Sequence, residues 1–128
     1  MTRTFETTND LWTYREAGTI GIDVRRGIDL TGWSVEAVDG GIGKIDEATY
    51  DTSQSYVVVD TGPWIFGKKV MLPAGVIDRV EADSETVFVS RTKDEIKNAP
   101  EFDEDRYRDE DYMTEVDGYY GRFEDRPL

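Results

Sequence analysis

The sequence predicts an all-β fold: a small, closed, six-stranded antiparallel β-barrel with one short C-terminal helix and with N- and C-terminal extensions. Short runs of alternating or β-branched apolar residues recur between turn residues, at the spacing of a small sheet protein. The chain has 128 residues, enough for one domain with a core of its own. Closure is expected because a sheet this small would otherwise expose two edges.

The predicted strands are bounded by glycine, proline or polar residues. They cover residues 33–38, 42–48, 56–60, 68–72, 76–80 and 86–90. In the first strand, Trp33, Val35 and Ala37 fall on one face, which is the period-two pattern of a half-buried strand. Asp39-Gly-Gly41 then favours a hairpin turn, and Gly43 indicates a bulge or a tight bend.

A short helix is predicted after the last strand. Thr92 and Glu95 have the spacing of a capping box, in which the hydroxyl accepts from a backbone N–H and the carboxylate reaches back. Asp94 suits the positive end of the helix dipole. The helix is expected to end before Pro100, because the residue preceding a proline avoids the α region.

Charge and pattern divide the chain into an N-terminal arm (residues 1–29), a folded domain (30–99) and an acidic, tyrosine-containing tail (100–128). Residues 1–98 hold 17 acidic and 11 basic residues, whereas the last thirty residues hold 11 acidic and 4 basic residues. The net charge of the whole chain is −13. Within the tail, Asp117-Gly-Tyr-Tyr-Gly121 is interpreted as a turn that presents two aromatic rings.

Composition excludes several classes of site. The chain has no Cys and no His, so it can form no disulfide, thiolate zinc site, imidazole metal site or Ser-His-Asp triad. Its apolar runs are far shorter than the roughly 20 residues of a membrane helix. The N-terminus lacks the apolar stretch of a signal peptide, which favours a cytoplasmic location. The acidic balance disfavours nucleic acids, because their backbones are anionic.

Three segments together resemble the PRC-barrel family, which is named for the cytoplasmic domain of the photosynthetic reaction-centre H subunit. They are Asp39–Asp46 (DGGIGKID), Tyr56–Ala74 (YVVVDTGPWIFGKKVMLPA) and Arg91–Asp103 (RTKDEIKNAPEFD). The resemblance spans about residues 30 to 103 and implies a small β-barrel of the same kind as the strand pattern predicts. The chain is most similar to stand-alone bacterial members, for which the family implies a fold and no established chemistry.

The predicted function is noncatalytic: a cytoplasmic module for protein–protein interaction or assembly. Aromatic density outside the central segment favours this function, because aromatic side chains are enriched at protein interfaces. We expect a homo-oligomer, a dimer or larger, with an unidentified protein partner, and we expect no nucleic acid, no insertion into a membrane, no cofactor and no metal. The residues expected to contact a partner or a second copy are aromatic anchors and two lysines: Trp12, Trp64, Phe66, Lys68, Lys69, Tyr119 and Tyr120.

Other functions stay open as alternatives. The resemblance to the H subunit implies a peripheral component of a membrane-associated photosynthetic or electron-transfer complex. A carboxylate-based hydrolase would need a pocket that holds two carboxyl groups with raised or split pKa values. Asp103-Glu-Asp105 and Asp109-Glu-Asp111 are the densest acidic groups, and they are interpreted as a solvated charge run. They do not form an EF-hand loop, since Arg108 occupies the position that requires glycine.

Overall fold

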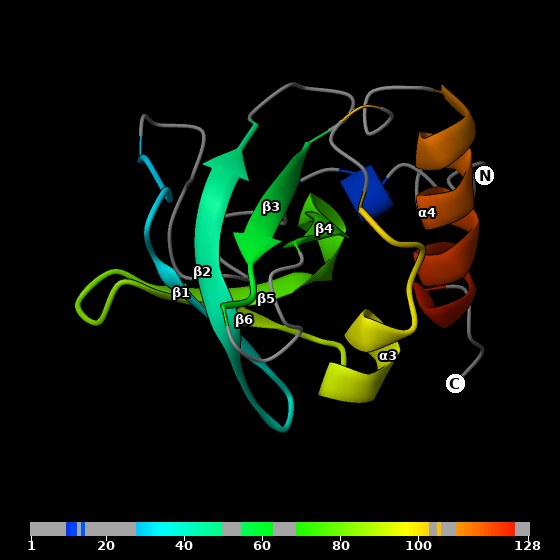
Figure 1. Ribbon diagram of the computed structural model, residues 1–128. Coiled ribbons are helices and arrows are strands. Elements are labelled where there is room, and N and C mark those ends of the chain that lie inside the picture. Colours follow the sequence, from blue (N-terminus) through cyan, green and yellow to red (C-terminus); the bar gives the residue numbers. More distant parts are fainter. Residues whose placement is uncertain are drawn as a thin grey trace, which may run out of the picture.

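The computed structural model describes residues 10–12, 14, 28–49, 55–62, 69–102, 105 and 110–124. Six strands form one mixed sheet in the order β4-β3-β2-β1-β6-β5 (Figure 1). Their bounds are β1 (Ser34–Ala37), β2 (Gly40–Ala48), β3 (Tyr56–Asp60), β4 (Lys69–Pro73), β5 (Ile77–Glu81) and β6 (Thr86–Val89). The sheet-rich fold and the places of the predicted strands are therefore confirmed.

Two features of the predicted barrel are wrong. The sheet is not wholly antiparallel, because β1 and β6 pair in parallel, with Ser34 beside Thr86 and Glu36 beside Phe88. The sheet is also not closed, since β4 and β5 remain its two edges. Only the 3₁₀ turn η3 (Ala74–Val76) separates these edge strands along the chain. The chain thus crosses directly from one edge to the other, and β5 then pairs with β6 instead of with β4.

A close approach between β2 and β3 explains the glycine predicted to form a bulge or bend. The β1–β2 register shifts between Val35 and Glu36, opposite this part of β2. Gly43 has a φ of 148°, and a Cβ atom there would lie 2.1 Å from the carbonyl oxygen of Asp60. A side chain at this position would therefore be strained and would also collide with backbone.

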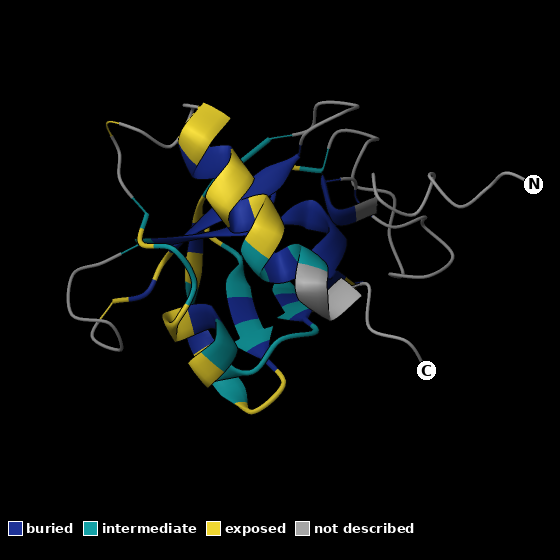
Figure 2. Cartoon of the chain, turned by 90° about the vertical axis from the view of Figure 1, so that its right-hand side faces the viewer, coloured by how far each residue is buried: buried dark blue, intermediate teal, exposed yellow. Residues whose placement is uncertain are grey.

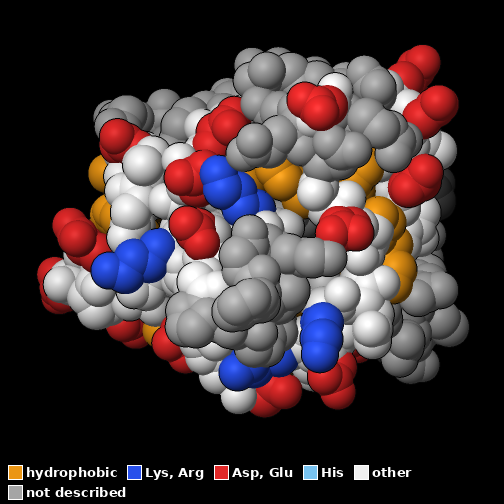
Figure 3. All heavy atoms as spheres, in the orientation of Figure 1, with side chains coloured by type: hydrophobic (Ala, Val, Ile, Leu, Met, Phe, Trp, Pro, Cys, Tyr) orange, Lys and Arg blue, Asp and Glu red, His pale blue; other side chains and the backbone are white. Residues whose placement is uncertain are grey.

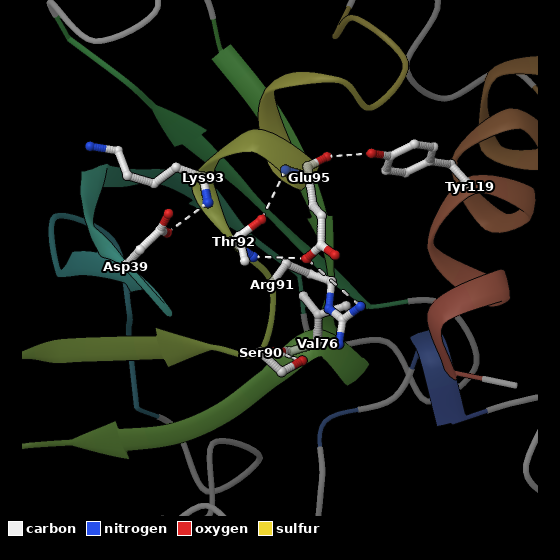
Figure 4. Close-up of polar contacts among 8 residues, drawn as sticks. All are labelled: Asp39, Val76, Ser90, Arg91, Thr92, Lys93, Glu95 and Tyr119. Atoms are coloured by element: carbon white, nitrogen blue, oxygen red, sulfur yellow. Dashed lines mark hydrogen bonds and ion pairs between the residues drawn. The ribbon is translucent and has the colours of Figure 1, made fainter. Parts of the chain in front are cut away.

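The predicted short helix is present as α3 (Lys93–Lys97). The Thr92 hydroxyl accepts from the Glu95 N–H at 3.1 Å, and the Glu95 carboxylate accepts from the Thr92 N–H at 2.9 Å (Figure 4). The Lys93 N–H also donates to the Asp39 carboxylate at 2.8 Å. The capping box is confirmed, and the β1–β2 turn is attached to the start of α3.

A second, longer helix, α4 (Glu110–Glu124), was not predicted. The expected turn at residues 117–121 is wrong, because these residues lie inside this helix. Figure 2 shows buried residues on one side of α4 and exposed residues on the other. The buried positions repeat at helical spacing: Tyr112, Met113, Val116 and Tyr120. Gly118 and Gly121 hide this pattern in the sequence, since glycine lowers helix propensity by about 1 kcal/mol per residue.

One hydrophobic core joins the sheet to described residues of both extensions. The 3₁₀ turn η1 (Asp10–Trp12) contacts η3 and α4, and α4 also contacts β4. Figure 1 shows α4 beside the sheet, with η1 close to it. Leu11, Trp12 and Tyr14 enter the same core as the buried side of α4. In the part of the chain that the structure describes, no helix has the length and apolar character needed to cross a membrane.

Candidate interaction site

Trp12, the predicted contact residue of the arm, lies in the core of its own chain. Its side chain is only 7% exposed. The indole Nε1–H donates to Asp117 Oδ1 of α4 at 2.8 Å, and the Trp12 carbonyl accepts from the Ser55 N–H at 2.7 Å. Trp12 therefore joins the tail helix to the residue just before β3.

Tyr119 and Tyr120, the predicted contact residues of the tail, attach α4 to the rest of the chain. The Tyr119 hydroxyl donates to the carbonyl oxygen of Glu95 at 2.6 Å (Figure 4). Tyr120 is fully buried, and its ring meets the Tyr119 ring edge to face, with the centroids 5.1 Å apart. Burial, with a smaller contribution from Tyr119, raises the pKa of Tyr120 far above its usual range. Tyr120 thus stays neutral, and its hydroxyl has no hydrogen-bond partner among the described residues.

Polar contacts around α3 fix the end of β6 against η3 (Figure 4). The backbone N–H of Ser90 donates to the carbonyl oxygen of Val76 at 2.9 Å, and the Ser90 hydroxyl donates to the same oxygen at 3.3 Å. Arg91 Nη1 lies 3.9 Å from Glu95 Oε1. These contacts join the end of β6 to η3 and to α3, so the polar cluster has a structural role.

Lys69 is the first residue of β4, and it lies beside Asp60, the last residue of β3. Its Nζ lies 3.0 Å from Asp46 Oδ2 on β2, and both side chains are partly exposed. An open hollow of about 360 Å³ lies at the end of β3 that leads toward β4. Asp60 Oδ1 accepts a hydrogen bond from the Gly62 N–H at 3.0 Å, and this bond stabilises the turn that follows β3. The described residues that line the hollow are Gly43, Lys44, Asp60, Thr61 and Gly62.

Trp64, Phe66 and Lys68 lie outside the described residues. In the sequence they belong to the connection between Gly62, which lines the hollow, and Lys69, which begins β4. Seven residues were predicted to contact a partner. The structure places four of them in contacts within the chain, namely Trp12, Lys69, Tyr119 and Tyr120. The other three lie outside the described residues.

Two exposed carboxyl groups among the described residues, those of Asp29 and Glu81, have shifted pKa values, and both are lowered. Within the described ranges, no group of three or more Asp and Glu side chains could hold a metal ion. A hydrogen bond from the Thr31 N–H lowers the pKa of Asp29, and hydrogen bonds from Arg79 and Ser84 lower the pKa of Glu81. Both shifts are opposite to the raised pKa that a general acid needs.

No protein-family model matches the chain, and the search of curated proteins finds no relative. Inference about function therefore depends on the residues themselves.

The sequence did not indicate two residues that the structure places at the candidate site or in the contacts that support it. Asp117 carries no local signal, because its partner is Trp12, 105 positions away. Lys44 was missed because it lies in the hollow only through the pairing of β2 with β3.

Proposed function

We propose that this chain is a noncatalytic, cytoplasmic protein-interaction module, and that its partner binds at the end of the sheet where β3 leads into β4. The observation that carries the proposal is the open hollow at the end of β3. The connection contains Trp64-Ile-Phe66 in the sequence, and aromatic residues dominate the binding energy of many interfaces. The other predicted aromatic anchors are already used within the chain.

Charged side chains of both signs lie at this place. The chain as a whole carries a net charge of −13. At this end of the sheet Lys44 and Lys69 lie among carboxylates, because Asp46 pairs with Lys69 and Asp60 lines the same hollow as Lys44. Figure 3 shows acidic side chains spread over the face that it draws, with a smaller number of basic ones among them. Complementary charges across an interface fix the orientation of the partner, so these charges favour a partner segment that itself carries both signs.

We also propose that the chain is a distant relative of the PRC-barrel family with an open sheet. Support comes from the order of the three resembling segments along the chain. They contribute most of β2, both β3 and β4, and α3. The family relation adds no chemistry to the proposal, and the interaction role depends on the hollow and on the aromatic connection alone.

Affinity capture with matched variants tests the interaction role. Trp64→Ala and Phe66→Ala should each lose the partner that the unaltered chain retains, while circular dichroism shows that they stay folded. Val38→Ala is the control, because Val38 is an exposed apolar residue, 67% accessible, in the β1–β2 turn. The purified partner should then bind the chain and the control variant with equal affinity. Equal retention by all variants would overturn the proposed site.

A further inference from the structure

We propose that the two Asp-Gly steps of this chain, Asp39-Gly40 and Asp117-Gly118, are sites of isoaspartate formation that the fold holds inactive through long-range hydrogen bonds. They are the only places in the sequence where glycine follows aspartate. Glycine has no side chain to shield its backbone nitrogen from the preceding carboxyl group. Both aspartates are exposed, so water can reach them. This proposal does not depend on the proposed partner site.

The reaction at such a step begins when the glycine nitrogen attacks Cγ of the aspartate. A bond forms between N and Cγ, the amide proton and the carboxyl OH leave as water, and a cyclic succinimide results. Water then opens the ring. When it breaks the bond between N and the original carbonyl carbon, the main chain runs through Cγ as isoaspartate. The carboxyl group must first turn toward the next nitrogen, so a bond that fixes it elsewhere slows the reaction.

The carboxylate of Asp39, in the β1–β2 turn, is held by the start of α3. The Lys93 N–H donates to Asp39 Oδ1 at 2.8 Å, and Figure 4 shows the carboxylate facing this nitrogen. The two residues are 54 positions apart, so only the folded chain forms the bond. Gly40 has a φ of 142°, which a residue with a side chain rarely adopts. The turn therefore requires the glycine that makes this step reactive.

The carboxylate of Asp117 is held in the same way by the N-terminal part of the chain. Its Oδ1 accepts from Trp12 Nε1–H at 2.8 Å, across 105 positions. Gly118 lies inside α4, where backbone N–H groups bond to the preceding turn. A hydrogen-bonded amide gives up its proton less readily, so this second step should be the slower one. Both carboxylates thus depend on a donor far along the chain.

Isoaspartate at either step would damage the fold, because it lengthens the backbone by its Cβ atom. At Asp39 the longer turn would disturb the β1–β2 pairing and remove the bond to α3. In α4 it would interrupt the helix between Val116 and Tyr120, which are both buried in the core. The two hydrogen bonds therefore determine how long the folded chain persists.

Substitutions that remove one donor and leave both Asp-Gly steps intact test the proposal. Lys93→Pro removes the donor N–H at the first position of α3, where proline is tolerated, and Thr92 before it already has an extended backbone. Lys93→Ala is the matched control, because it removes the side chain and keeps the N–H. Trp12→Phe removes the indole N–H and keeps an aromatic ring. The full chains are incubated at neutral pH, and mass spectrometry with electron-transfer fragmentation measures isoaspartate at each step.

Each variant should accelerate one step and not the other. Lys93→Pro should raise the rate at Asp39 by about fivefold, the factor that corresponds to a hydrogen bond of about 1 kcal/mol. Trp12→Phe should raise the rate at Asp117 by a similar factor. Lys93→Ala should match the unaltered chain at both steps. Because general unfolding accelerates both steps, selective acceleration separates loss of one bond from loss of the fold.

The unaltered chain supplies a second measurement that needs no variant. In urea both steps should form isoaspartate faster than in the folded chain, because unfolding breaks both long-range bonds. Equal rates in urea and in buffer would overturn the proposal. So would donor variants that react at the rate of the unaltered chain, or that accelerate both steps together.

Discussion

Trp12 and Asp117 are 105 positions apart in the chain, yet the indole Nε1–H of Trp12 donates a 2.8 Å hydrogen bond to Asp117 Oδ1. This bond joins a 3₁₀ turn near the N-terminus to the last helix. Both elements contribute buried side chains to the core of the sheet. The arm and the tail are therefore supports of the fold in their described parts.

Removing the acceptor of this bond should destabilise the fold. Asp117→Ala leaves a buried indole N–H without its partner, so the free energy of unfolding should fall by about 1–2 kcal/mol. Asp117→Asn keeps an acceptor oxygen and should lose less than half of that. Urea unfolding followed by circular dichroism measures both. Equal stability of Asp117→Ala and the unaltered chain would show that the bond contributes nothing.

Tyr119 and Tyr120 should respond in opposite directions to loss of the hydroxyl. Tyr120→Phe removes a buried hydroxyl that has no hydrogen-bond partner among the described residues, so stability should rise by about 1 kcal/mol. Tyr119→Phe removes the 2.6 Å hydrogen bond to the Glu95 carbonyl oxygen and should lower stability by about 1 kcal/mol. A marked loss of stability in Tyr120→Phe would contradict the unpartnered hydroxyl.

Tyr120 should also make stability depend on alkaline pH. Burial keeps its pKa raised in the folded chain, while in the unfolded chain the group ionises near its ordinary value of 10.0. Above about pH 10 the unfolded chain therefore binds fewer protons than the folded chain, and the free energy of unfolding falls as the pH rises. Urea unfolding of Tyr120→Phe should show a shallower decline over this interval. Parallel pH profiles would mean that Tyr120 does not contribute.

Two glycine-to-alanine substitutions should have opposite effects. Gly43→Ala places a Cβ 2.1 Å from a backbone oxygen at positive φ, so it should cost about 3 kcal/mol or more. Gly118→Ala, in α4, meets no atom within 4 Å and should stabilise the helix by about 0.5–1 kcal/mol. Thermal unfolding compares the two, and a gain at Gly43 or a loss at Gly118 would contradict the described backbone.

Local signals predicted the strands and α3 from the sequence because each depends on neighbouring residues. Alternation and turn glycines marked the strands, and Thr92 with Glu95 marked the helix start. Strand partners carry no such signal. Nothing in the runs 34–37 and 86–89 indicates that β1 and β6 pair in parallel, and this pairing is what separates the observed sheet from the predicted antiparallel barrel.

The candidate site was predicted in part for a similar reason. Composition identified Trp12 and Tyr120 as aromatic residues outside the central segment, but it cannot distinguish burial by the same chain from burial by a partner. The structure assigns both rings to the chain's own core. Gly118 and Gly121 concealed the helix that carries Tyr120, so its burial could not be foreseen. The alignment of residues across β2, β1, β6 and β5 likewise became visible only once the strand pairing was known.

Hydrogen–deuterium exchange of the chain, alone and with its purified partner, tests most directly where the partner binds. Peptides that span Thr61 to Lys69 should exchange more slowly in the complex, because the proposed contact covers this end of the sheet. Peptides from α4 should exchange at the same rate in both states. Slower exchange confined to α4, with residues 61–69 unchanged, would contradict the proposed interaction site.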